Sequence, residues 1–159
     1  MGDGLSSGLM TTIDLMLNQH PRAVPTTRES YAVAAAALSM CEEVCTSCAD
    51  ACLGETEHVH KLVRCIRANL DCTEICGTTA RLLTRQTESD APVVQAQLHV
   101  CVLACQTCAD ECSAHAAMHG HCATCADTCR YCQECCNRLL GEISSSGVRE
   151  ENFSTHAAA

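Results

Sequence analysis

Aromatic residues are scarce in this chain: they make up 2% of its 159 residues, with two Tyr, one Phe and no Trp. Basic residues are also few, because 10 Lys and Arg stand against 19 Asp and Glu and leave a formal net charge of −9. Proteins that bind nucleic acids carry basic patches and often stacking aromatic side chains. The composition therefore argues against nucleic acid as a partner.

Two further absences concern catalysis and targeting. The sequence has no Gly-rich nucleotide loop and no inward-facing Glu-x-x-His set, so it offers no support for an enzyme. The N-terminus has no basic segment followed by a long apolar run, and we expect neither a secretion signal nor a membrane-spanning segment. The expected compartment is the cytoplasm.

Cysteine, by contrast, is abundant, with 17 positions in the chain. The cytoplasm keeps thiols reduced, and an odd number of cysteines cannot all pair within one chain. We therefore expect the cysteines to act mostly as thiols.

The chain is expected to be all-α, because no segment alternates apolar and polar residues with the period of a strand. Capping residues, Gly and Pro divide the body into four helices, and short turns between them favour an antiparallel up-down-up-down four-helix bundle. The four helices are expected at about 27–53, 57–86, 91–119 and 121–143.

Three segments follow from this pattern. Residues 1–25 are expected to be a leader with a short extra N-terminal helix, which Pro21 and Pro25 separate from the body. Residues 26–143 are expected to form the cysteine-lined four-helix bundle. Residues 144–159, which are rich in Ser and contain two adjacent Glu, are expected to be a disordered tail.

The cysteines recur in steps of three and four along each expected helix, which puts their side chains on one face. That face is the one that a bundle buries. Asn69 takes the position of a missing cysteine, and Cys135 lies beside the stripe. The cysteines on the four helices are Cys41, Cys45, Cys48 and Cys52; Cys65, Cys72 and Cys76; Cys101, Cys105, Cys108 and Cys112; and Cys122, Cys125, Cys129, Cys132, Cys135 and Cys136.

Three interpretations of these thiols compete: small buried apolar residues, a disulfide scaffold, and a lumen filled with metal. Cysteine is smaller than leucine, so a core built from it would pack loosely unless something fills the space. The compartment, the odd count and the regular spacing within helices disfavour disulfides. The pattern therefore favours metal.

Cu(I) fits the spacing best, with Zn(II) behind it. Seven Cys-x-x-x-Cys pairs are present, and side chains four residues apart on a helix lie about 5–6 Å from one another, which suits a soft ion with few ligands. Structural zinc usually uses Cys-x-x-Cys on loops, and runs ending in Cys-Pro that hold iron–sulfur clusters are absent. Each Cu(I) also replaces one thiol proton, so the lumen stays near neutral.

The two ends of the expected bundle differ. At one end, which we call the mouth, His58, His115 and His119 extend the cysteine stripes, with His60, His121 and Met118 nearby. Each histidine alone is typical of a solvated helix end, whereas the cluster favours metal ligands or a route for metal. The opposite end, which we call the plug, is apolar; it comprises Tyr31, Ala34, Leu38, Leu82, Leu83, Val94, Leu98, Leu139, Leu140 and Ile143.

The cysteine pattern on these four helices, which we call the cysteine ladders, resembles that of the bacterial copper storage proteins, which are four-helix bundles with a cysteine-lined lumen. The resemblance covers roughly 28–143 and depends on three strings. It implies many Cu(I) ions along the lumen, most of them held by cysteines of one helix, and a Cu(I)-binding role for histidines at the open end. It also implies a homotetramer, as in the cytosolic branch. The strings are Cys41-Glu-Glu-Val-Cys45-Thr-Ser-Cys48-Ala-Asp-Ala-Cys52, Cys101-Val-Leu-Ala-Cys105-Gln-Thr-Cys108-Ala-Asp-Glu-Cys112 and Cys122-Ala-Thr-Cys125-Ala-Asp-Thr-Cys129-Arg-Tyr-Cys132.

The sequence thus predicts a non-catalytic, cytoplasmic store of about 17 Cu(I) ions, at roughly one ion per thiolate. Its expected partners are copper ions, further copies of the chain and a copper chaperone. One alternative is a zinc or heavy-metal buffer, with about four thiolates per ion. Another is a thiol redox sensor, for which Cys122 and Cys125 near a helix N-terminus are the candidates.

Overall fold

The computed structural model describes residues 11–22 and 28–154, with side chains described as far as residue 145. Within these residues it contains five helices and no strand, which confirms the prediction of an all-α chain. The helices are α1 (Thr12–Asn18), α2 (Arg28–Gly54), α3 (Val59–Leu83), α4 (Ala91–His115) and α5 (Gly120–Ser154).

Helix starts follow the local capping chemistry. The Thr11 hydroxyl accepts a hydrogen bond from the Asp14 N–H at 3.2 Å and so caps α1. Asp90 caps α4 by accepting from the Val93 N–H at 3.0 Å, with Pro in the first turn, where its missing N–H costs nothing. Thr26 and Thr27, which precede α2 and are of the type that caps helices, lie outside the described residues, as do residues 1–10 and 23–25 of the expected leader.

Two helices end earlier than the sequence predicts. Helix α3 stops at Leu83 rather than near residue 86, and the Thr84 hydroxyl donates to the Arg81 carbonyl at 3.0 Å in its last turn. Helix α4 stops at His115 rather than near His119. The chain between α4 and α5 is held by a hydrogen bond from the His119 N–H to the His115 carbonyl at 3.0 Å, and this turn brings His119 over the mouth.

Helix α5 is longer than predicted. It was expected to end near Ile143, with disorder from residue 144 onward, but the structure is helical through residues 144–154. No Pro follows Ile143 to stop the helix, and the Ser145 hydroxyl donates to the Gly141 carbonyl at 2.8 Å within it. The remaining residues of the expected tail, 155–159, lie outside the described residues.

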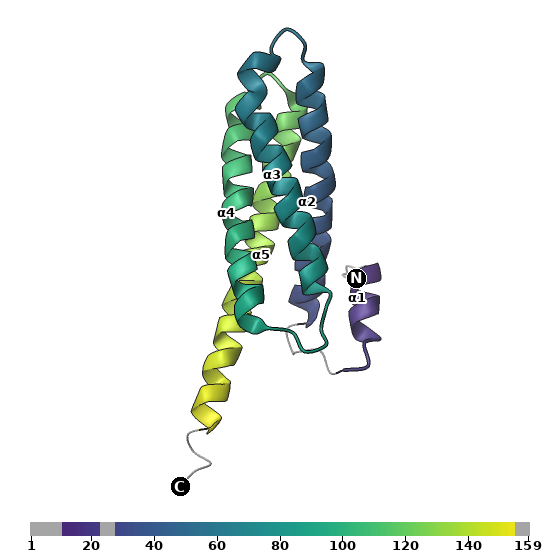
Figure 1. Cartoon of the computed structure of the whole chain (residues 1–159), viewed down its shortest axis with the longest axis vertical. Helices are drawn as coiled ribbons and strands as arrows, with labels where there is room; N and C mark the ends of the chain where they lie inside the picture. The colour runs from purple at the N-terminus through teal and green to yellow at the C-terminus, as the bar shows by residue number, and fades with distance from the viewer. Residues whose placement is uncertain (1–10, 23–27, 155–159) are drawn as a thin grey trace, which may run out of the picture.

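The four long helices lie side by side around one interior (Figure 1). Helix α2 contacts α3 and α5, and α4 contacts the same two helices, so each long helix touches two neighbours. The short helix α1 packs beside α2. The α2–α3 and α4–α5 connections lie together at one end, while α5 projects beyond the other helices at the opposite end (Figure 1).

The interior changes character along its length. At the plug, Leu38, Leu83, Leu98 and Leu139 are fully buried, with Val94 beside them. Burying one such side chain stabilises the fold by about 1.5–3 kcal/mol. Thiols line most of the interior from this plug to the mouth, together with the buried Asn69 and Leu62. The plug is therefore the part of the core that can hold the helices together without metal.

Helix α2 is long and apolar enough to cross a membrane by length and composition, with a mean hydropathy of 1.3, whereas no such segment was expected from the sequence. Half of that window is buried inside the protein, and all four cysteines of α2 are buried. The core helix of a bundle meets the same criterion because its buried face is apolar.

Candidate metal site

All seventeen cysteines are buried and unpaired, which agrees with the expectation of thiols rather than disulfides. Sixteen of them are at most 2% exposed and line the interior between the plug and the mouth; we call these the interior cysteines. The seventeenth, Cys135, is 4% exposed. The 3.6-residue period of the helices explains this arrangement, because steps of three and four keep each stripe facing inward.

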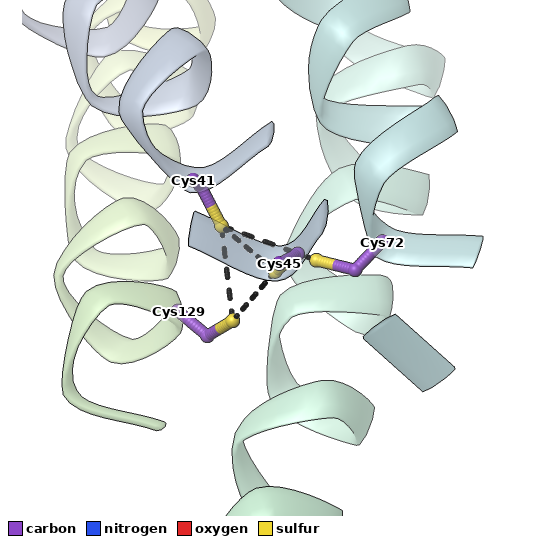
Figure 2. Close-up of side chains that lie close together, drawn as sticks. All are labelled: Cys41, Cys45, Cys72 and Cys129. Carbon is purple, nitrogen blue, oxygen red and sulfur yellow. Dashed lines mark hydrogen bonds between the residues drawn. The ribbon is translucent and has the colours of Figure 1, made fainter. Parts of the chain in front are cut away.

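The sulfurs are close enough to share metal ions. Cys41 and Cys45 of α2 lie 3.8 Å apart at Sγ, and Cys129 of α5 lies 3.7 Å from the first and 3.5 Å from the second. Cys72 of α3 completes the group at 4.0 Å from Cys41. Figure 2 shows these four side chains converging from three helices. Such a group offers four soft donors around one small volume, as soft-metal thiolate sites require.

Groups of this kind recur along the lumen. Within each group the donor atoms all lie within 4.8 Å of one another. Neighbouring groups share members, so a metal ion bound by one group lies beside thiols of the next. The groups include Cys41, Cys76, Cys105 and Cys132; Cys45, Cys108, Cys125 and Cys129; and Cys48, Cys112 and Cys125.

Most of the close sulfur contacts join different helices. Within one helix, the sulfur pairs Cys41–Cys45 and Cys72–Cys76 lie 3.8 and 3.7 Å apart. The resemblance implied ions held mainly by the cysteines of one helix, whereas this geometry also favours thiolates that bridge helices. Contacts between helices include Cys45–Cys125 (3.7 Å), Cys65–Cys112 (3.5 Å), Cys76–Cys101 (3.7 Å), Cys76–Cys105 (3.6 Å) and Cys52–Cys122 (3.9 Å).

Asn69 fills the gap in the thiol ladder of α3. It is fully buried, and its Nδ2 donates to the Cys65 carbonyl at 2.9 Å and to the Cys112 sulfur at 3.4 Å. Its Oδ1 accepts from the thiols of Cys125 at 3.0 Å and Cys108 at 3.4 Å. Every hydrogen-bonding atom of this buried amide is thus satisfied by the surrounding ladder.

At the mouth, His121 is the imidazole that meets the thiols. Its Nδ1 lies 3.5 Å from the sulfurs of Cys48 and Cys122. It lies 4.0 Å from the sulfur of Cys52. These four residues form a further group with metal-binding geometry. The sequence placed His121 only near the stripe, although its position directly before Cys122 in the first turn of α5 was a usable signal.

The predicted histidines take different positions. His119 is 8% exposed, and its ring centroid lies 5.5 Å from that of His121 and 6.4 Å from that of His58. His115 is half-buried at the end of α4, and among the described residues its side chain has no hydrogen bond to a thiol. The structure therefore brings His58 and His119 together and adds His121 to them.

Glu55, in the connection between α2 and α3, was not singled out from the sequence. Its Oε1 lies 3.0 Å from His119 Nδ1 and 3.4 Å from His121 Nε2. The hydrogen bond with His119, assisted by the one with His121, lowers the pKa of the Glu55 carboxyl below its ordinary value. These contacts join residues more than sixty positions apart in the sequence, so no local motif indicates them.

Cys135 lies apart from the interior cysteines. It lines a separate cavity of about 270 Å³ with Glu29, Ser30 and Arg138 among its neighbours. A hydrogen bond with Cys135 raises the pKa of the Tyr131 hydroxyl. Among the described residues, Cys135 has no sulfur contact with another cysteine, so the structure does not bring this predicted ligand together with the rest.

Burial disfavours the charged, thiolate form of cysteines inside the metal-free protein. Burial raises the pKa of the Cys122 thiol to about 12. Hydrogen bonds to Cys101 and Cys132, together with burial, raise the pKa of the Cys136 thiol. Neutral thiols avoid the cost of buried, unpaired charge. Since the thiolate is the ligand form, metal binding here must release protons.

A helical bundle whose interior is a continuous array of reduced thiols, with imidazoles at one end, is a protein built to hold many soft metal ions. A sequence model of the copper storage proteins matches residues 27–141, and the chain belongs to this family. The family prediction made from the cysteine ladders is confirmed.

Solved structures and a curated relative agree with this assignment. The chain is similar to the copper storage protein Ccsp of Streptomyces lividans loaded with 10 copper equivalents, with 41% identity, a TM-score of 0.80, and coverage of 82% of this chain and 98% of that one. A cytosolic copper storage protein from Streptomyces lividans with five coppers is 44% identical, with a TM-score of 0.70 and coverage of 71% and 93%. The uncharacterized cysteine-rich protein YhjQ of Bacillus subtilis is 32% identical over 99 residues, 62% of this chain and 85% of that protein.

Proposed function

We propose that this protein stores Cu(I) as thiolate-bridged clusters inside its helical bundle, in the cytosol and without catalysing a reaction. The observation that carries the proposal is the set of sixteen interior cysteines, each at most 2% exposed. A single-site metalloprotein needs about four ligands. Sixteen cysteines are four times that number, so they provide enough thiolates to hold many ions at once. Holding many ions at once is what distinguishes a store from a single-site metalloprotein.

Charge favours Cu(I) over Zn(II) as the stored ion. One Cu(I) replaces one thiol proton and leaves the interior neutral, whereas Zn(II) with four thiolates carries a net charge of about −2. Among the described residues, the buried polar side chains are Asn69, Thr79 and His119, so no Lys or Arg lies inside to balance such a charge. A buried, uncompensated charge costs several kcal/mol.

We propose the sixteen interior cysteines as the ligands, with His121 and the predicted histidines His58, His115 and His119 as donors at the mouth. Cys135 is left out of this set because it faces a separate cavity. At roughly one ion per thiolate the capacity is about 16 Cu(I) ions. The interior cysteines are Cys41, Cys45, Cys48, Cys52, Cys65, Cys72, Cys76, Cys101, Cys105, Cys108, Cys112, Cys122, Cys125, Cys129, Cys132 and Cys136.

The storage unit is an up-down-up-down four-helix bundle over residues 26–143, with the short helix α1 docked on it. Short connections between successive long helices and the contacts of each with two neighbours support this topology. Residues 1–25 are a leader, and residues 144–159, which contain no cysteine, lie outside the storage unit.

Copper enters and leaves through the mouth. The opposite end is closed by fully buried leucines, which offer an ion no ligand. At the mouth, His121 and three thiols form a group accessible from solvent, because the His121 side chain is 25% exposed. An ion bound there can pass to the next group by exchanging one sulfur at a time: each new thiol gives up its proton as it becomes a thiolate ligand, and the sulfur that the ion leaves takes up a proton.

The expected partners are a copper chaperone as donor and further copies of this chain, with a homotetramer implied by the family resemblance. Exposed apolar side chains on α3 and α4 support self-association. Leu70, Val100 and Leu103 are 45%, 49% and 64% exposed, and the last two line a surface groove of about 220 Å³. Sedimentation of the metal-free chain tests the oligomeric state.

The proposed function is tested by titrating the reduced, metal-free protein with Cu(I) under anaerobic conditions against a chromophoric chelator. Binding of well over ten ions per chain ahead of the chelator is expected. Saturation at about four or fewer would overturn storage and favour a zinc buffer. Loss of a measurable thiol-exchange activity on changing Cys122 and Cys125, without loss of metal capacity, would instead favour a redox sensor.

A further inference from the structure

The carboxylate of Glu55 joins three elements at the mouth. Glu55 directly follows α2, and its Oε1 contacts Nδ1 of His119 before α5 and Nε2 of His121 within α5. The backbone of its own short connection is held by hydrogen bonds, among them His58 N–H to the Glu55 carbonyl at 2.8 Å. The carboxylate therefore contacts both imidazoles from a backbone segment that is held in place by hydrogen bonds.

A carboxylate is a poor ligand for Cu(I), which prefers sulfur and imidazole donors. An ionised carboxylate can only accept hydrogen bonds. The ring nitrogen that faces it must therefore carry the hydrogen, and in a neutral imidazole the other nitrogen then keeps its lone pair. One oxygen that contacts two imidazoles in this way determines the tautomer of both.

The two rings present opposite nitrogens to Glu55. His121 uses Nε2 at 3.4 Å, which leaves Nδ1 with its lone pair. That Nδ1 is the atom lying 3.5 Å from the sulfurs of Cys48 and Cys122. His119 uses Nδ1 at 3.0 Å, which leaves its Nε2 with the lone pair. The geometry thus places the lone pair of His121 Nδ1 among the thiols. A second lone pair, that of His119 Nε2, lies on the neighbouring ring.

We propose that Glu55 is a positioning residue of the mouth: by accepting from both imidazoles it sets opposite tautomers in His119 and His121, so that His121 offers Nδ1 to copper among the thiols. This role rests on the proposed function, since it concerns the route by which the store is filled. Removing a carboxylate that accepts a hydrogen bond from a metal-ligating imidazole typically changes metal affinity or activity by about 10–100-fold.

The first test reads the tautomers in the metal-free, full-length chain labelled with ¹⁵N, by long-range ¹H–¹⁵N correlation spectra. In the wild-type protein His121 is expected to carry its hydrogen on Nε2 and His119 on Nδ1. In Glu55→Gln the side-chain amide can donate as well as accept, so both rings are expected to become tautomer mixtures. Unchanged tautomers in Glu55→Gln would overturn the proposal.

The second test measures how fast the first two equivalents of copper transfer from a Cu(I)–bicinchoninate complex in a stopped-flow instrument. Glu55→Gln is expected to slow this transfer about tenfold and to leave the number of ions at saturation unchanged. Glu57→Gln is the matched control, because Glu57 is exposed in the same connection and should load at the wild-type rate. A wild-type loading rate in Glu55→Gln would refute the role.

Glu55→Asp separates the carboxylate from the side-chain length. It keeps the accepting group, so wild-type tautomers and a rate closer to wild type than that of Glu55→Gln are expected. If Glu55→Asp loads at the wild-type rate while both rings become tautomer mixtures, loading does not depend on the tautomers and the proposal is wrong. Failure of storage itself is seen separately, as a low copper capacity in the wild-type chain, while the tautomer spectra need no metal.

Discussion

Replacing one cysteine inside the lumen and one outside it should distinguish effects on copper capacity from effects on the free energy of unfolding. Cys45 Sγ lies within 4.0 Å of four other sulfurs, those of Cys41, Cys108, Cys125 and Cys129, and belongs to two of the four-thiol groups. At roughly one ion per thiolate, Cys45→Ala should lose at least one Cu(I), and about two if both groups need this bridging sulfur.

Cys135→Ala is the matched control, because Cys135 is also buried but lines a separate cavity. Each substitution deletes one buried heavy atom, so each should lower the free energy of unfolding of the metal-free protein by about 1 kcal/mol. The expected pattern is therefore equal losses of stability, measured by urea unfolding, and unequal losses of copper capacity.

The assay is the anaerobic Cu(I) titration against a chelator, run in parallel on both variants and the wild-type chain. Cys135→Ala should keep the full capacity. A loss of copper in Cys135→Ala equal to that in Cys45→Ala would refute the assignment of a single lumen. Full capacity in Cys45→Ala would show that bridging sulfurs in this group are dispensable.

Four further outcomes follow from the same structure. Asn69→Cys restores the missing ladder thiol next to Cys65 and should add about one Cu(I) in the same titration. Leu98→Ala, in the plug, should lower the stability of the metal-free protein by about 2–5 kcal/mol in urea unfolding, while capacity stays unchanged. Stripping copper with a strong chelator should leave the helical circular dichroism intact, because the plug and the neutral thiols hold the bundle; its loss would mean that metal folds the chain. Because the folded-state pKa of Cys122 is raised to about 12 from an ordinary value of 9.0, the folded state keeps a proton that the unfolded chain loses. The metal-free protein should therefore keep its stability below about pH 9 and lose it as the pH rises toward 12, which urea unfolding at several pH values measures.

Much of the fold was predictable because its signals are local. The steps of three and four between cysteines depend only on the helical period, and they correctly indicated which face is buried. The cap at Asp90 was visible as a short sequence pattern. Helix ends were less predictable: α5 runs on to Ser154 because Ser and Gly are tolerated within a helix when no Pro follows.

The positions of the candidate ligands were predictable where they depend on spacing within one helix, and no further. Cys135, one residue before Cys136, is turned about 100° around α5, enough to place it outside the lumen. Its separation from the stripe could be read from the spacing, but the cavity that it faces could not. That cavity is lined in part by Glu29 and Ser30 of α2, which lie more than a hundred positions before Cys135 in the sequence.

The sequence by itself determined the class of metal, the helical elements and the inward direction of the thiols, because each depends on residue type and on spacing within one helix. Only the tertiary structure decided which sulfurs from different helices meet, that Asn69 is satisfied by four of its neighbours, and that Glu55 reaches His119 and His121. These contacts depend on how the helices rotate against one another and on where two connections end. If one helix were shifted along its axis by one turn, the sequence pattern would be unchanged, but the atoms that make these contacts would move apart by about 5 Å.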